Sequence, residues 1–217
     1  MKVLFIGNSS TYFHDIPKTM IQMAASMGNE MITDQITLGG CFLHRYADPL
    51  DQEAGVPARE KIAAGHDIVF LQDNGNCIAD EEAKEKSRAA CRTLHELIEK
   101  TGAKTYLYIR APYGYDVHNL TPKEHGEALT ALFGDLGKEL HAPCAHAAKA
   151  YAICREKHPE INLFWTDNAH TSVEGAYLSA CCCYHALYGN LPDEVFEGDI
   201  PHETALILKS IAREAMA

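Results

Sequence analysis

Hydrophobic and polar positions divide the chain into two kinds of segment that alternate. Short apolar runs, each ending at glycine or small polar residues, predict buried strands at 2–6, 31–38, 67–72 and 104–110, and residues 141–146 lead into a short fifth strand. Longer segments with one apolar stripe predict helices at 18–27, 43–46, 57–64, 81–100, 122–140, 147–157, 173–188 and 201–216. This alternation predicts an α/β fold, with a parallel sheet between two layers of helices.

The chain has 217 residues, which is enough for one α/β domain with a full core. It shows no internal repeat and no low-complexity linker, so residues 1–217 are expected to form a single domain. The sequence gives no indication of the oligomeric state.

Charge and hydropathy exclude several partners. The net charge of −11 argues against nucleic acid or an anionic membrane as the partner. No apolar run is long enough to cross a membrane, and the first strand begins without a signal-peptide pattern. A cytoplasmic protein is therefore expected.

Eight cysteines are present, and none forms a C-x-x-C pair. Without a secretion signal, they are expected to be reduced thiols, and the run at 181–183 is expected to pack as small buried side chains. The histidines and cysteine within 141–146, and Cys181 with His185, have irregular spacing and no fourth ligand nearby. No metal site is therefore predicted.

The first predicted strand ends at Gly7, and Asn8, Ser9 and Ser10 follow it. Ligands bind at the carboxyl ends of strands in open α/β sheets, and glycine permits a close approach of the backbone. Ser9 is therefore a candidate nucleophile. The alternative is that Ser9, Ser10 or Thr11 only caps the next helix.

A second polar stretch, at 166–172, precedes the helix predicted at 173–188. Asp167 and His170 are separated by two residues, so that a carboxylate can contact an imidazole. That pair provides the base and its orienting partner in a hydrolytic triad, with Ser9 as the nucleophile. The chain order Ser, Asp, His is permitted, because geometry and not order defines a triad.

The blocks GNSST and DNAH, with Gly40 and Asn74 between them, resemble the SGNH (GDSL-type) hydrolases. The resemblance is to an uncharacterised bacterial branch with G-N-S in its first block and D-x-x-H in its last, and it covers nearly the whole chain. Two positions depart from the family pattern. Thr171 replaces the usual proline, and the third block reads QDNG where the family has G-x-N-D.

The resemblance implies a three-layer α/β/α sandwich whose five-stranded parallel sheet has the flavodoxin-like order 2-1-3-4-5. It also implies roles for single residues. Ser9 would be the nucleophile, His170 the base and Asp167 its partner, while the Ser9 and Gly40 N–H groups and the Asn74 amide would form an oxyanion hole. Such an enzyme requires no cofactor.

Polar and planar side chains lie in the loops that follow the strands. Six of them are candidate substrate contacts: His14, His44, Arg45, Asp73, Arg110 and Tyr113. They suit sugar hydroxyls or a carboxylate, and no apolar segment predicts a long acyl groove. We therefore predict a serine esterase that removes short acyl groups, chiefly O-acetyl, from a carbohydrate or another polar small molecule.

Two other classes of function remain open at this point. One is a non-catalytic carbohydrate- or ligand-binding module on the same fold, since fold does not fix function. The other is a lipolytic esterase of the lysophospholipase type. A metal- or cysteine-dependent phosphoesterase or redox protein is disfavoured, because the chain has no phosphate loop and no organised ligand set.

Overall fold

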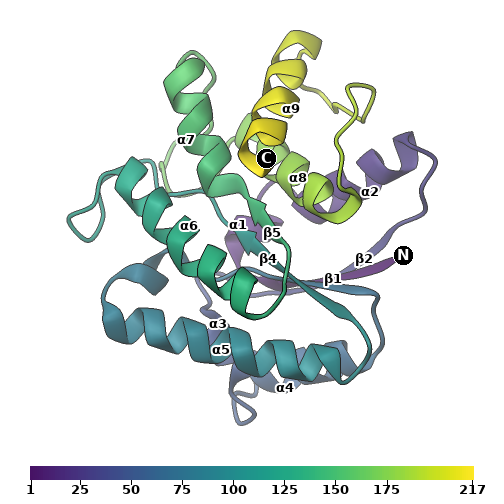
Figure 1. Cartoon of the computed structure of the whole chain (residues 1–217), viewed down its shortest axis with the longest axis vertical. Helices are drawn as coiled ribbons and strands as arrows, with labels where there is room; N and C mark the ends of the chain where they lie inside the picture. Colours follow the sequence, from purple (N-terminus) through teal and green to yellow (C-terminus); the bar gives the residue numbers. More distant parts are fainter.

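One parallel sheet of five strands runs through the centre of the molecule (Figure 1). The computed structural model describes residues 1–217. The strand order is β2-β1-β3-β4-β5, and every neighbouring pair is parallel. The strands are β1 (Lys2–Gly7), β2 (Ile32–Thr37), β3 (Ile68–Leu71), β4 (Lys104–Ile109) and β5 (Cys144–His146). The predicted fold class and strand order are confirmed.

Helices cover both faces of this sheet. They are α1 (Ser9–Tyr12), α2 (Ile16–Ser26), α3 (Leu43–Ala47), α4 (Gly55–Ala63), α5 (Glu81–Glu99), α6 (Pro122–Glu139), α7 (Ala147–Lys157), α8 (Val173–Tyr188) and α9 (His202–Met216), with a 3-10 helix η1 (Gly75–Ile78). Buried side chains of α3 to α6 form one apolar cluster with one face of the sheet. Buried side chains of α2, α8, α9 and most of α7 form a second apolar cluster with the other face of the sheet. Figure 1 shows the two helix layers on opposite sides of the sheet.

The sequence signals located most element ends to within one or two residues. Asp15 caps α2, and Thr121 with Glu124 forms a capping box at the start of α6. The structure adds α1 and η1, which are single turns in the loops after β1 and β3. Both are too short for a helical period to show in the sequence.

The carboxyl ends of β1, β2 and β3 lie side by side, because β1 pairs with β2 on one edge and with β3 on the other. The connection from β1 to β2 therefore runs toward one edge of the sheet, and the connection from β2 to β3 runs back toward the other edge. This is the switch point at which open α/β sheets bind ligands. It brings the loops that carry Ser9, Gly40 and Asn74 to one place.

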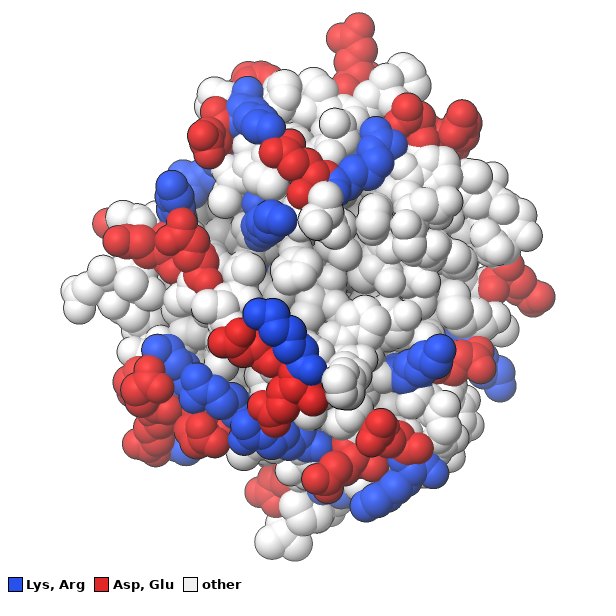
Figure 2. Space-filling view, viewed as in Figure 1, with Lys and Arg blue, Asp and Glu red and all other residues white.

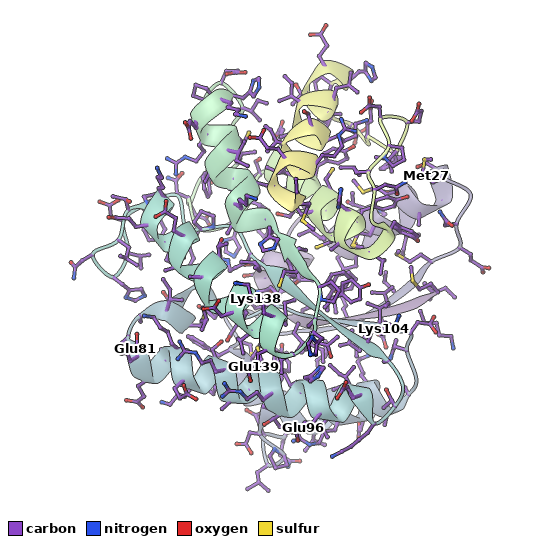
Figure 3. All side chains as sticks on the ribbon, viewed as in Figure 1. Met27, Glu81, Glu96, Lys104, Lys138 and Glu139 are labelled. Atoms are coloured by element: carbon purple, nitrogen blue, oxygen red, sulfur yellow. The ribbon has the colours of Figure 1, made fainter.

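The surface carries acidic and basic side chains in mixed array (Figure 2). Two ion pairs join neighbouring helices. Glu139, labelled near the end of α6 in Figure 3, accepts from Arg92 of α5 at 2.6 Å. Because both side chains are exposed, solvent screens this pair and it contributes little to stability. None of the helices combines the length and the apolar character needed to span a membrane.

Candidate active site

Ser9 is the first residue of α1, immediately beyond the end of β1. Asn8 caps this turn: its Oδ1 accepts from the Ser10 N–H at 3.0 Å, and its Nδ2 donates to the Cys41 carbonyl at 2.9 Å. Asn8 is itself buried. These bonds fix the backbone on both sides of Ser9 and tie it to the loop after β2.

Gln72 braces the same turn from β3. Its buried Oε1 accepts from the Asn8 N–H at 2.9 Å and from the Thr11 hydroxyl at 3.0 Å. Gly7 leaves the space that this side chain fills, because a Cβ there would lie 2.6 Å from Gln72 Oε1. The glycine in the first block is therefore required by packing beneath the serine.

Asp167 and His170 occupy a tight turn between α7 and α8. Asp167 Oδ1 accepts from the N–H groups of Ala169 at 2.9 Å and His170 at 3.0 Å, and Asn168 adopts the left-handed conformation with φ of 54°. The Trp165 N–H donates to the His170 carbonyl at 2.9 Å. These local bonds hold the carboxylate beside the imidazole, and the Gly114 N–H, which donates to the Asn168 carbonyl at 2.7 Å, ties the turn to the loop after β4.

Three side chains form a continuous series of hydrogen bonds. His170 Nδ1 lies 2.7 Å from Asp167 Oδ2, and His170 Nε2 lies 2.9 Å from Ser9 Oγ. The bond to His170, together with the backbone N–H groups, lowers the pKa of Asp167 to about 2. The Asp167 carboxylate therefore stays ionised at neutral pH. The Phe13 ring stacks on the imidazole with centroids 4.6 Å apart, which limits the rotation of His170.

Gly40 and Asn74 lie next to each other beside Ser9. Asn74 Nδ2 donates to the Gly40 carbonyl at 2.8 Å, and Asn74 Oδ1 caps η1 by accepting from the Asn76 N–H at 2.9 Å. Gly40 has φ of 65°, which glycine adopts without strain, and its N–H donates to no protein acceptor. An N–H group without an acceptor, next to a hydroxyl nucleophile, can stabilise a developing oxyanion.

A cavity of about 390 Å³ opens over Ser9. It is lined by Asn8, Ser9, Ser10, Gly40, Phe42, Asn74, Asn76, Arg110, Tyr113, Tyr115, Ala169 and His170. Six of the predicted site residues are among them, and Asp167 contacts the cavity-lining His170. The loops after β1, β2, β3, β4 and α7 each contribute.

The structure places three predicted substrate contacts on the surface outside this cavity. Arg45 turns away into ion pairs with Asp51 at 2.7 Å and Glu53 at 3.1 Å. His44 is exposed beside the Phe42 ring. His14 stands edge-on to Trp165 and lines a separate cavity of about 550 Å³ between α2 and α8. None of these three side chains lines the cavity over Ser9.

Asp73 is buried and points into the protein. Its Oδ1 accepts from the backbone N–H groups of Leu43 at 2.8 Å and Asn74 at 2.7 Å, and its Oδ2 from the Ser87 hydroxyl at 2.5 Å. Burial raises the pKa of this carboxyl group. Asp73 therefore ties the loops after β2 and β3 together and does not line the cavity over Ser9.

Phe42, Asn76 and Tyr115 line the cavity but were not predicted as substrate contacts. Each of them lies in a loop after a strand, within a few residues of a predicted site residue. That position in the sequence could have identified them as candidate contacts. The structure brings no three His, Cys, Asp or Glu side chains together in a metal-binding group.

The sequence matches no family model and no curated protein. Solved structures do match it. A DUF4886 family protein from Bacteroides uniformis aligns with a TM-score of 0.81 and 16% identity over 99% of this chain and 94% of its own. A candidate SGNH hydrolase from Slackia heliotrinireducens aligns with a TM-score of 0.71 and 19% identity over 86% and 98%.

A catalytic mutant of Axe2, an acetylxylan esterase from Geobacillus stearothermophilus, aligns with a TM-score of 0.59 and 14% identity over 86% of this chain and 94% of its own. Each alignment spans nearly the whole of the other chain, so the similarity is to complete domains. At this level of identity the similarity concerns the fold. The resemblance found in the sequence is confirmed at that level: the chain has the fold of the SGNH hydrolases and esterases.

Proposed function

We propose that the protein is a serine esterase that uses Ser9, His170 and Asp167 as its catalytic triad. The observation that carries the proposal is the bonded series Ser9 Oγ, His170 and Asp167, with separations of 2.9 and 2.7 Å, at the edge of a cavity. A binding module would not need a serine hydroxyl aligned with an imidazole that a carboxylate orients.

In the proposed reaction Ser9 Oγ attacks the ester carbonyl carbon while His170 Nε2 takes the hydroxyl proton. Asp167 keeps the other proton on Nδ1 and stabilises the imidazolium that forms. When the tetrahedral intermediate collapses, His170 gives its proton to the leaving alcohol. Water then attacks the acyl-enzyme with His170 as base, and Ser9 is regenerated with release of the acid.

The negative oxygen of the intermediate needs donors that are already in place. We assign this role to the N–H groups of Ser9 and Gly40 and to the Asn74 amide, which surround one side of the cavity. The bond from Asn74 Nδ2 to the Gly40 carbonyl uses one amide hydrogen and leaves the second for the oxyanion. Each such donor contributes about 3 kcal/mol to lowering the barrier.

Replacing Asn74 with aspartate is expected to lower kcat by ~100-fold or more, because it keeps the η1 cap and removes the donor. Replacing it with alanine should lower kcat similarly and cost about 1 kcal/mol of stability as well, since the cap is lost. Steady-state kinetics and thermal unfolding of both variants test this. An unchanged kcat would move the role to Asn76, which also lines the cavity.

The substrate that fits best is a short-chain ester, chiefly an O-acetyl ester, of a carbohydrate or another polar small molecule. The cavity of about 390 Å³ is small, most of its lining residues are not hydrophobic, and the acetylxylan esterase shares the fold. The eight thiols are all unpaired, which suits the reducing cytoplasm as the proposed compartment.

We expect kcat/KM to be highest for the acetate ester in a series of p-nitrophenyl esters from acetate to palmitate. Each added methylene gains about 0.8 kcal/mol only where an apolar groove can bury it. Acetylated sugars should be assayed beside the series. A maximum at medium or long chains would identify a lipolytic enzyme. Absence of turnover throughout would favour a binding module.

A further inference from the structure

Arg110 is a buried cation without an anionic partner. It follows β4 directly, is only 5% exposed, and forms no ion pair. Its one hydrogen bond runs from Nη2 to the Ala169 carbonyl at 3.3 Å, and its Nε is buried with no partner. An arginine stays protonated at any physiological pH, so this charge is permanent.

The surroundings hold the guanidinium in a fixed position. It lies over the Tyr113 ring, 4.4 Å from the centroid. Gly75 leaves room for both groups, because a Cβ there would lie 2.5 Å from Arg110 Nη1 and 2.9 Å from Tyr113 Cζ. Arg110 lines the cavity together with Ser9 and His170. The charge is therefore both positioned and presented to a ligand in the candidate active site.

Asp167 and Asp73, the two acidic residues of the predicted site, do not pair with this charge. Asp167 is fully engaged by His170 and two backbone N–H groups. Asp73 accepts from two backbone N–H groups and the Ser87 hydroxyl, and it does not line the cavity. A buried charge without a partner is unfavourable, and an anionic ligand would compensate it.

We propose that Arg110 binds a carboxylate on the substrate, which makes the substrate an O-acylated acid such as a uronic acid or another hydroxy acid. The proposal rests on the proposed esterase function. Since the acyl group is short, the carboxylate belongs to the alcohol portion. A carboxylate fits better than a phosphate, because the cavity offers one guanidinium with planar, paired donors and no second cation.

The first test measures binding without turnover. In the Ser9→Ala variant, calorimetry should show methyl glucuronide binding at least ~10-fold more tightly than the matched glucuronamide, because a charge-assisted bond replaces a neutral one. Adding Arg110→Gln should remove this difference. Equal binding of the acid and the amide, or no binding of either at tens of millimolar, would overturn the proposal.

The second test compares turnover of 4-acetoxybenzoate with that of 4-acetoxybenzamide. The wild-type kcat/KM should favour the anion by about 10- to 100-fold, and Arg110→Gln should raise KM for the anion alone. Arg155→Gln removes an equal charge outside the cavity, where Arg155 lies over Phe164 at 5.6 Å, and should preserve the preference. An equal loss for both esters in Arg110→Gln would show that Arg110 only positions the Ala169 loop.

The two tests separate this proposal from the proposed function. If Ser9→Ala prefers the acid and loses the preference with Arg110→Gln, the carboxylate site stands even where neither ester is hydrolysed, and the esterase proposal alone fails. If both esters are hydrolysed at equal rates and the acid and the amide bind equally, the esterase proposal stands and the carboxylate site fails.

Discussion

Ser9→Ala is expected to reduce kcat for ester hydrolysis by at least ~10⁴-fold, to a rate that binding and the oxyanion donors alone can sustain. Oγ is the only atom of Ser9 that bonds to His170, at 2.9 Å, and alanine removes it. The Ser9 backbone stays in place, because Asn8 and Gln72 hold the turn through bonds that do not involve the Ser9 side chain. Thermal unfolding should therefore change little, and the loss should appear in kcat.

Ser10→Ala is the matched control for this variant. Ser10 is the next residue of the same turn, is 8% exposed, and has no bond to His170. We expect it to retain most of the activity. A fluorophosphonate probe should modify Ser9 in the wild-type protein, as read by mass spectrometry of the peptide. Modification at Ser10, or full activity in Ser9→Ala, would contradict the assignment of the nucleophile.

Asp167→Asn is expected to lower kcat by about 10³- to 10⁴-fold with little effect on KM. The amide keeps an oxygen for the N–H groups of Ala169 and His170, so that the turn should persist. Its NH₂ group, however, would face His170 Nδ1 and favour the tautomer with the proton on Nε2. That tautomer cannot accept the proton of Ser9.

The exposed Asp135 of α6, replaced by asparagine, serves as the control for the loss of one negative charge, since its side chain is 80% exposed. It should have no effect on kcat. A loss smaller than tenfold in Asp167→Asn would mean that His170 holds its tautomer without the carboxylate.

The low pKa of Asp167 also determines how its contribution to the stability of the folded protein depends on pH. Because the pKa falls from 3.8 to about 2 on folding, the ionised carboxylate stabilises the folded protein fully above pH 3.8. That contribution is lost as the pH falls through about 2. Protonation of Asp167 therefore does not limit activity at any pH used in ordinary assays.

The sequence by itself determined the elements and the local parts of the candidate site. Apolar runs that end at Gly7 and Gly39 predicted two strands, each followed by a loop with candidate functional residues. A strand can be predicted locally, because its pattern of apolar residues lies within a few consecutive positions. The pairing of Asp167 with His170 was also local: both lie in one turn, three residues apart. The strand order came only from the resemblance, because periodicity does not say which strands pair.

Only the tertiary structure decided which polar loop residues face the cavity. Loops position polar side chains through bonds to distant partners, and these partners cannot be read from the loop itself. Arg45 is drawn to Asp51 and Glu53, and Asp73 to a backbone N–H of α3 and a hydroxyl of α5. The tertiary structure likewise shows that Arg110 has no anionic partner. The sequence cannot show this, because the neighbours of a side chain are known only once the chain is folded.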